Sequence, residues 1–391
     1  MRILEGDSLL AARIDQEASD LRRVDSALAS LTDGPHDHEA STAVRDRFQL
    51  LIQQKTRYLR EIGDGSNGTP DWQRLAGALA DISPIKREAL AFIEGTLLRR
   101  SRLDAGVGEV AERLLLGLAR RSAIPREVLV SVDVGEFLDH TVSMIRVRFP
   151  DTSVWGLPLL AHELGHHVAA TLQHADPRLR EQSRPVAAYL TTESSREATA
   201  SERKVELSRL HELFADAYAT YSLGASYPAA AVALRAWPDD SAWSSTHPPW
   251  SRRVWTMIAT LRAMSEIADD GPRRPEYRLM ADHHIEPLWY RIAGKTTPED
   301  SVMRLVDKQS RNMVDLLHQH TPPRLRYDPL GPVHRLIAVL EAGAEEVPNG
   351  ATIAHVLQAA WLWRLEHWGV ERHTTDQVSD NALSLCRLAA P

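Results

Sequence analysis

Cysteine is almost absent from this chain of 391 residues, in which Cys386 is the only one. A single cysteine cannot form an internal disulfide, so nothing in the sequence indicates an oxidising compartment. Long apolar runs are missing as well: the N-terminal residues contain none suited to a signal-peptide core. No segment reaches the roughly 18–20 uninterrupted apolar residues that a membrane span needs. We therefore expect a cytoplasmic protein with no membrane span.

Basic residues are outnumbered, with 46 Lys and Arg against 53 Asp and Glu, for a net charge of −7. A chain of this sign has no overall attraction for nucleic acid or anionic lipid, and we expect neither as a partner. Hydrophobic residues make up 43% and charged residues 25%. This balance excludes a disordered chain, a fibrous repeat and a disulfide-stapled mini-domain.

Helical periodicity extends over most of the chain. Apolar residues within 10–31 and 44–62 recur at helical spacings on either side of a short breaker, which predicts an antiparallel helical hairpin. Helices are also expected over 158–171 and 193–223, and in several blocks after residue 271. The length is enough for two or three domains.

Two segments alternate with the period of a β-strand. Valine occupies every second position from Val128 to Val134, and apolar residues alternate with arginine from Ile145 to Phe149. Period two predicts half-buried strands. We therefore expect an α+β fold, predominantly helical, with a small sheet. The strand 145–149 is expected to be the edge along which an extended peptide binds.

The sequence HELGH, from His162 to His166, is an HExxH motif. Residues i and i+4 share one face of a helix, so both imidazoles can reach one metal ion. Zinc takes such nitrogen ligands, and a catalytic zinc site keeps one position open for water. Glu163 lies beside the first histidine, where its carboxylate can accept a proton from that water. Apolar neighbours argue against a surface helix with incidental histidines.

A third ligand is expected from the later sequence HELFAD, in which Glu212 and Asp216 share a helix face. Glu212 can bind the metal while Asp216 accepts the N–H of a ligand histidine and fixes its tautomer. Four other glutamates lie closer in sequence, within a polar stretch, and compete for the ligand position: Glu193, Glu197, Glu202 and Glu206.

These motifs together resemble a known family. HELGHH followed by ELFAD is similar to the glutamate-ligand zinc metallopeptidases, the gluzincins. The segment THPPWSRRV, from Thr246 to Val254, is similar to the THPxxxxR segment of the family M48 peptidases, the CAAX-prenyl protease and HtpX type. The resemblance covers residues 162–254.

The resemblance implies a zinc-dependent peptidase with one Zn²⁺ per chain and three protein ligands, which are His162, His166 and Glu212. It also implies that Glu163 is the general base and that His247 contacts the tetrahedral intermediate. Asp216 would orient a ligand, and Arg253 would hold the local structure. Many M48 members carry transmembrane helices, which this chain lacks.

On this basis we expect four segments: a helical hairpin (1–68), a helical segment (69–124), a zinc metallopeptidase core (125–268) and a helical C-terminal region (269–391). The expected ligand is a protein or peptide substrate, and the helical extensions offer a surface for a protein partner.

Two alternatives stay open: a non-catalytic or latent zinc-binding scaffold, and a zinc hydrolase of a non-peptide bond. The pairs His283–His284 and His318–His320 have side chains of the right type for a second metal site. Three tryptophans, Trp361, Trp363 and Trp368, are expected in the core or on a partner-facing helix rather than in a ligand site.

Overall fold

The computed structural model describes the chain apart from a set of short segments. These are 1–5, 32–38, 64–71, 102, 104, 125–128, 134–137, 140–143, 149–152, 180–182, 196–198, 238–246, 268–273, 295–298 and 344–345. Contacts divide the chain into two compact units. One combines Met1–Gly108 with Leu129–Pro150, and the other combines Glu109–Val128 with Asp151–Pro391. The expected segment boundaries do not coincide with these units.

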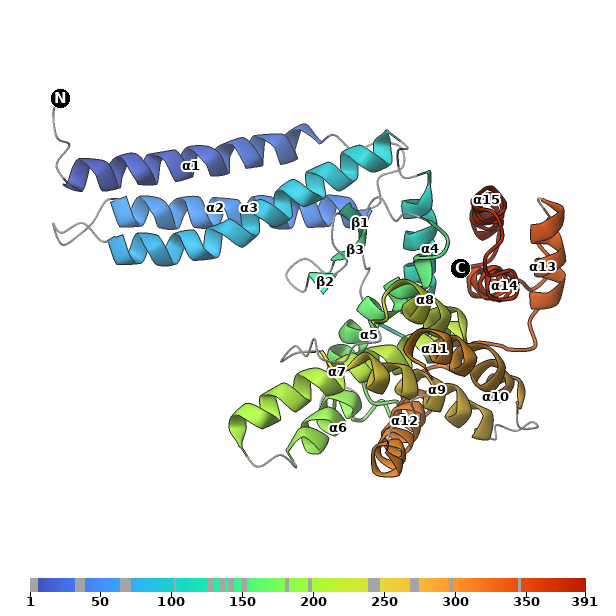
Figure 1. Ribbon diagram of the computed structural model, residues 1–391. Coiled ribbons are helices and arrows are strands. Elements are labelled where there is room, and N and C mark those ends of the chain that lie inside the picture. Colours follow the sequence, from blue (N-terminus) through green and yellow to red (C-terminus); the bar gives the residue numbers. More distant parts are fainter. Residues whose placement is uncertain are drawn as a thin grey trace. The chain divides into compact units, whose positions relative to one another are not determined.

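The first unit is built on three long helices: α1 (Gly6–Ser30), α2 (Glu39–Gly63) and α3 (Trp72–Arg100). Helix α2 runs antiparallel to the other two, as Figure 1 shows. Each helix buries one apolar stripe, represented by Leu21 and Leu28 of α1, Phe48 and Ile52 of α2 and Phe92 of α3. Burial of these stripes holds the three helices together.

The same unit contains three short strands, β1 (Leu129–Asp133), β2 (Leu138–Asp139) and β3 (Met144–Arg148). The strand order is β1-β3-β2, with β1 parallel and β2 antiparallel to β3. Strand β3 therefore lies between two partners, and β1 packs on α3. The expectation that 145–149 is an edge strand is wrong, because β3 is the central strand of the sheet.

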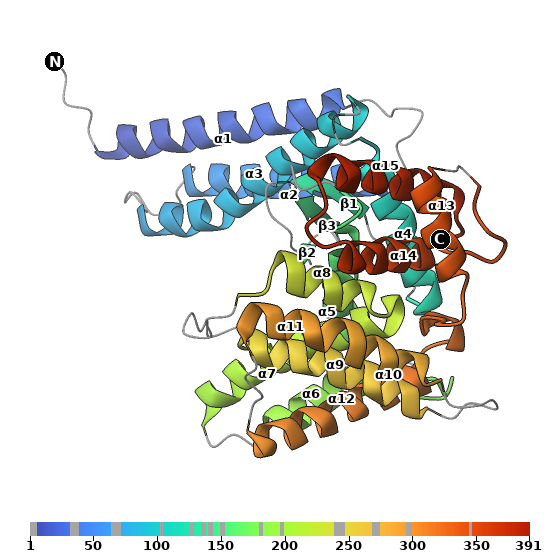
Figure 2. The same cartoon turned by 45° about the vertical axis from the view of Figure 1, so that its right-hand side comes forward.

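The second unit consists of helices joined by loops, as Figure 2 shows. It begins with α4 (Val107–Arg121), of which all but the first two residues belong to this unit. The elements that follow are η1 (Leu157–Leu159), α5 (Leu160–Thr171), α6 (Pro185–Ser194), α7 (Ala200–Leu223), α8 (Ser226–Leu234), α9 (Trp250–Glu266), α10 (Glu276–Met280), η2 (Ala281–Ile285), α11 (Glu286–Ala293), α12 (Asp300–His320), η3 (Pro323–Leu325), α13 (Val333–Ala342), α14 (Ile353–Glu366) and α15 (Arg372–Leu388).

The expected fold class, α+β with a zincin-type core containing a small sheet, is wrong. The unit that holds the HExxH motif has no strand among its described residues, and the three short strands belong to the other unit. Periodicity identifies residues that form a strand, but it does not say which core the strand joins. The fold around the motif is therefore helical.

Helix α7 has clear local start and stop signals. The Thr199 side chain accepts from the backbone N–H of Glu202, and the Glu202 carboxylate accepts from the backbone N–H of Thr199, which forms a capping box. The helix ends at Gly224, whose φ of 64° suits a residue without a Cβ. The helix expected over 193–223 is therefore α7, which begins at Ala200, and residues 193–194 are the end of α6.

In the part of the chain that the structure describes, no helix has the length and apolar character needed to cross a bilayer.

Candidate metal centre

Helices α5 and α7 approach each other closely at Gly165. A Cβ atom at this position would lie 2.8 Å from Cα and 3.1 Å from the carbonyl oxygen of Ala215. Real Cβ atoms do not approach a backbone this closely, so the packing requires glycine here. The close approach brings the histidines on the turns beside Gly165 toward the acidic residues beside Ala215.

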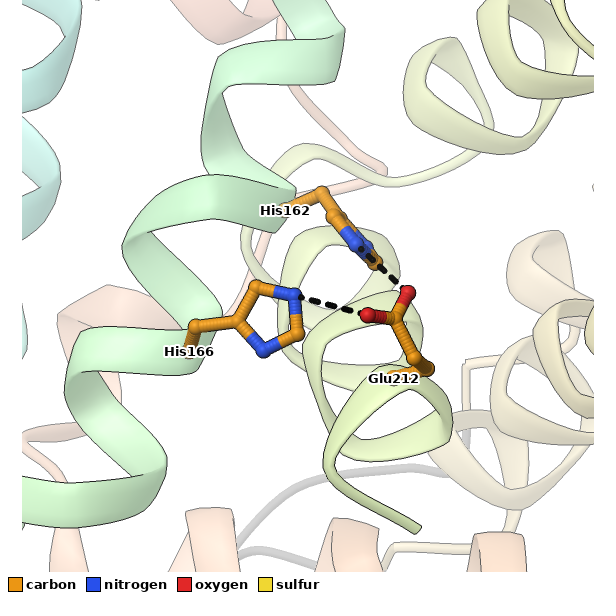
Figure 3. Close-up of side chains that lie close together, drawn as sticks. All are labelled: His162, His166 and Glu212. Carbon is orange, nitrogen blue, oxygen red and sulfur yellow. Dashed lines mark ion pairs between the residues drawn. The ribbon is translucent and has the colours of Figure 1, made fainter. Parts of the chain in front are cut away.

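The side chains of His162, His166 and Glu212 converge between these two helices (Figure 3). Nε2 of His162 lies 3.3 Å from Oε2 of Glu212, and Nε2 of His166 lies 3.5 Å from Oε1. One ligand atom from each residue falls within 4.8 Å of the others. These three residues can therefore hold a metal ion.

The charges at the site follow from burial and from the neighbouring groups. Burial, together with the charge of His162, lowers the pKa of His166 to about 3 and keeps this imidazole neutral. Burial alone would also lower the pKa of His162, but Asp216 and Glu212 outweigh it and raise the pKa to about 9. Burial would raise the pKa of Glu212, yet His162 and Arg253 bring it down to about 2. Glu212 is thus an anion.

Asp216 lies completely buried behind His162, with Oδ1 2.9 Å from Nδ1 of the imidazole. Because Nδ1 faces this carboxylate, the other ring nitrogen, Nε2, is the one presented to Glu212. This arrangement is typical of a metal-binding histidine, in which one ring nitrogen contacts a carboxylate and the other is directed at the metal position.

Arg253 of α9 neutralises the buried Asp216. Its Nε donates to Oδ2 and its Nη2 to Oδ1, each at 2.8 Å, which is a two-point contact with the carboxylate. Burial would raise the pKa of Asp216, but Arg253 holds it well below its usual range. The guanidinium carbon also lies 4.5 Å from the centroid of the Trp250 ring, and Nη1 lies 3.8 Å from Oε2 of Glu212. Arg253 therefore links α9 to both acidic residues of α7.

Tyr227 of α8 is a site residue that the sequence did not reveal. Its hydroxyl donates to Oδ1 of Asp216 and lies 3.1 Å from Nδ1 of His162, while its ring stacks parallel to the imidazole. The surrounding sequence, SYPAAAVAL, has no motif that marks a functional tyrosine. Trp250, whose ring lies under the Arg253 guanidinium, is part of the THPPWSRRV segment, but the resemblance gave it no role.

His247 reaches the same group of residues from the loop before α9. Its Nε2 lies 3.4 Å from Oε1 of Glu212, and its side chain is 58% exposed. The preceding residues 238–246, which include Thr246 of the THP segment, lie outside the described residues. His247 thus lies at the solvent side of Glu212, where an approaching ligand can meet it.

Glu163 lies on α5 directly after His162 and is half-buried. Among the competing acids, Glu202 caps α7, and Glu206 pairs with Arg252 at 2.9 Å. Glu197 lies outside the described residues. Within those residues, Glu212 is the carboxylate that joins the two histidines.

The histidine pairs considered for a second metal do not form such a group in the described structure. His283 and His284 lie in the π-helical turn η2, followed by Pro287. Proline has no backbone N–H and disrupts the regular hydrogen bonds of an α-helix. Pro287 therefore explains the π-helical turn, and no metal site is needed to account for it.

Comparison with protein-family models, with curated proteins and with solved structures finds no match to this chain. The class of protein therefore rests on the site: a helical protein with a His-His-Glu group that can bind a metal ion.

Proposed function

We propose that this protein is a zinc-dependent peptidase of the gluzincin type. The observation that carries the proposal is the convergence of Nε2 of His162, Nε2 of His166 and the Glu212 carboxylate within 4.8 Å. Two histidines and one glutamate are the ligand set of catalytic zinc sites that retain a position for water. The order of the three sequence motifs, which resembles family M48, supports the same class.

Zinc held by these residues supplies a Lewis acid, which lowers the pKa of a water molecule and polarises a carbonyl group. Asp216 and Tyr227 hold the imidazole of His162 in the required tautomer. Arg253 keeps Asp216 ionised, so that its carboxylate accepts a hydrogen bond from the imidazole of His162 and does not donate one.

Glu163 takes the role of proton acceptor, because it is the carboxylate adjacent to His162 and it does not belong to the ligand group. It receives the proton of the attacking water and passes it to the leaving amine. His247, on the solvent side of Glu212, stabilises the negative charge that develops on the substrate oxygen. The substrate is a protein or peptide.

The metal is tested by elemental analysis of the purified protein. We expect one zinc per chain, and loss of that zinc in His162→Ala, His166→Ala and Glu212→Gln. Glu206→Gln is the matched control, because Glu206 lies on the same helix but pairs with Arg252. Retention of zinc in Glu212→Gln together with its loss in Glu206→Gln would overturn the ligand assignment.

The peptidase activity is tested with casein and a peptide library, with and without a chelator. Glu163→Gln should retain zinc and the fold but lose hydrolysis, because only the proton acceptor is changed. A wild-type protein that binds zinc and cleaves no peptide would instead support the scaffold or the non-peptide hydrolase.

A further inference from the structure

Three hydrogen-bond donors on α14 have no acceptor in the described structure. They are Nε2 of Gln358, Nε1 of Trp361 and Nη1 of Arg364, and each of these atoms is buried. The residues follow one another at intervals of three along the helix, so they occupy adjacent positions on one side of it. Buried donors are normally paired, and three in succession on one helix are therefore unusual.

Neighbouring polar groups in this region do find partners. Two residues after Trp361, the Trp363 indole donates to Oε1 of Glu341 at 3.1 Å. The side-chain oxygen of Gln358 accepts from the backbone N–H of Ser226 at 2.9 Å, which leaves the amide NH₂ facing elsewhere. The unpaired donors thus belong to one particular side of α14.

Arg364 lies among three indole rings. Its guanidinium carbon is 4.5 Å from the ring centroid of Trp155, 5.1 Å from Trp361 and 5.8 Å from Trp368. The rings of Trp155 and Trp361 meet edge to face at 5.5 Å. A guanidinium packed on aromatic faces keeps its N–H groups at the edge, where they can form a two-point contact with a planar acceptor.

No carboxylate of the described residues pairs with Arg364. Burial lowers its pKa, and no acidic residue counteracts that effect. By contrast, Arg253 and Arg262 of the same unit are both paired with acids. Trp368 is 51% exposed, so the cluster reaches the surface beside Arg364.

We propose that Arg364, Trp361 and Gln358 form a binding site for an oxyanion, a carboxylate or a phosphate group. The site consists of donors and one cation with no internal acceptor, and an oxyanion supplies both the negative charge and several acceptor atoms. The indole rings shield the ion pair from water, which strengthens it. This site is separate from the metal centre and does not depend on the proposed peptidase activity.

The test uses the full-length protein and the indole N–H signals of its 10 tryptophans. Sodium phosphate and sodium acetate are titrated separately at constant ionic strength, maintained with sodium chloride. The Trp361 signal, identified by its loss in Trp361→Phe, should shift in a saturable way with at least one of the two anions. The Trp363 signal is the internal control, because its N–H already donates to Glu341. The anion that saturates at lower concentration identifies the ligand as carboxylate or phosphate.

Arg364→Gln should weaken binding by about 10–100-fold, the usual effect of removing a charged hydrogen-bond partner. Arg364→Lys retains the charge without the planar fork and should weaken binding less, which keeps the test valid if Arg364→Gln does not fold. Arg335→Gln, at an exposed position of α13, is the matched control and should bind as the wild type does. No saturable shift with either anion, or equal binding by Arg364→Gln, would overturn the proposal.

Discussion

The contact between Gly165 and Ala215 predicts a coupled loss of stability and metal affinity in Gly165→Ala. The added methyl group would meet the Ala215 Cα at 2.8 Å. The Ala215 Cα is a backbone atom and cannot move aside as the end of a flexible side chain can. Helices α5 and α7 must therefore separate by several tenths of an ångström.

The stability change combines two opposing effects. Overpacking costs about 1–3 kcal/mol, and replacing glycine by alanine within a helix recovers about 1 kcal/mol. The net expectation is a destabilisation of about 0–2 kcal/mol. Because His162 and His166 lie on α5 and Glu212 on α7, the same separation misplaces the ligand atoms. Zinc affinity should fall by about 10–100-fold, as it does when groups that orient metal ligands are disturbed.

Urea unfolding measures the stability, and competition with a chromophoric chelator measures the zinc affinity. The matched control is Gly77→Ala in α3, where an added Cβ meets nothing within 4 Å. That variant should stabilise the first unit by about 0.5–1 kcal/mol and leave zinc affinity unchanged. A Gly165→Ala protein with wild-type stability and wild-type zinc affinity would refute the packing argument.

Three further predictions concern the groups behind the metal centre. Tyr227→Phe retains the ring that stacks on His162 but removes the hydroxyl that contacts Asp216, and urea unfolding should show a loss of about 1.5–3 kcal/mol; a variant as stable as the wild type would contradict this. Asp216→Asn removes the closer of the two charged partners of the buried Arg253 and leaves only Glu212, at 3.8 Å, so it should cost on the order of 3–5 kcal/mol. Asp282→Asn, which loses a more exposed pair with Arg262, should cost about 1 kcal/mol or less by the same measurement. In the metal-free protein, the pKa of His162 is raised to about 9. Protonated His162 should therefore stabilise the fold fully below about pH 6.5, and this stabilisation should be lost as the pH rises through about 9. Urea unfolding of chelator-treated protein between pH 6 and pH 9 measures this loss of stability, which should be about 3 kcal/mol at most. His162→Gln should reduce the dependence of the free energy of unfolding on pH. If the pH dependence is unchanged in that variant, another group is responsible for it.

Much of the helical structure can be predicted from sequence because its determinants are local. The apolar spacing within 10–31 and 44–62 identifies α1 and α2. The stripe of α1 is buried as expected, whereas in α2 the buried positions include Ile52 and Leu59 in place of Leu51 and Tyr58. The HExxH spacing places His162 and His166 on one face of α5, because helix geometry alone determines which residues share a face. These features depend only on residues a few positions apart.

The assembly of the site depends on contacts between residues far apart in sequence. Several glutamates were open as the third ligand, and the packing of Gly165 on Ala215 brings Glu212 to the histidines. Tyr227 became recognisable only when α8 packed beside His162, and the unpaired donors of α14 only when their surroundings were known. The strands at 129–133 and 144–148 were recognisable locally, yet they belong to the unit that does not contain the candidate metal centre. Sequence periodicity determines the helices and the face each one buries, whereas tertiary packing determines which faces meet, because steric fit and charge pairing act between distant segments.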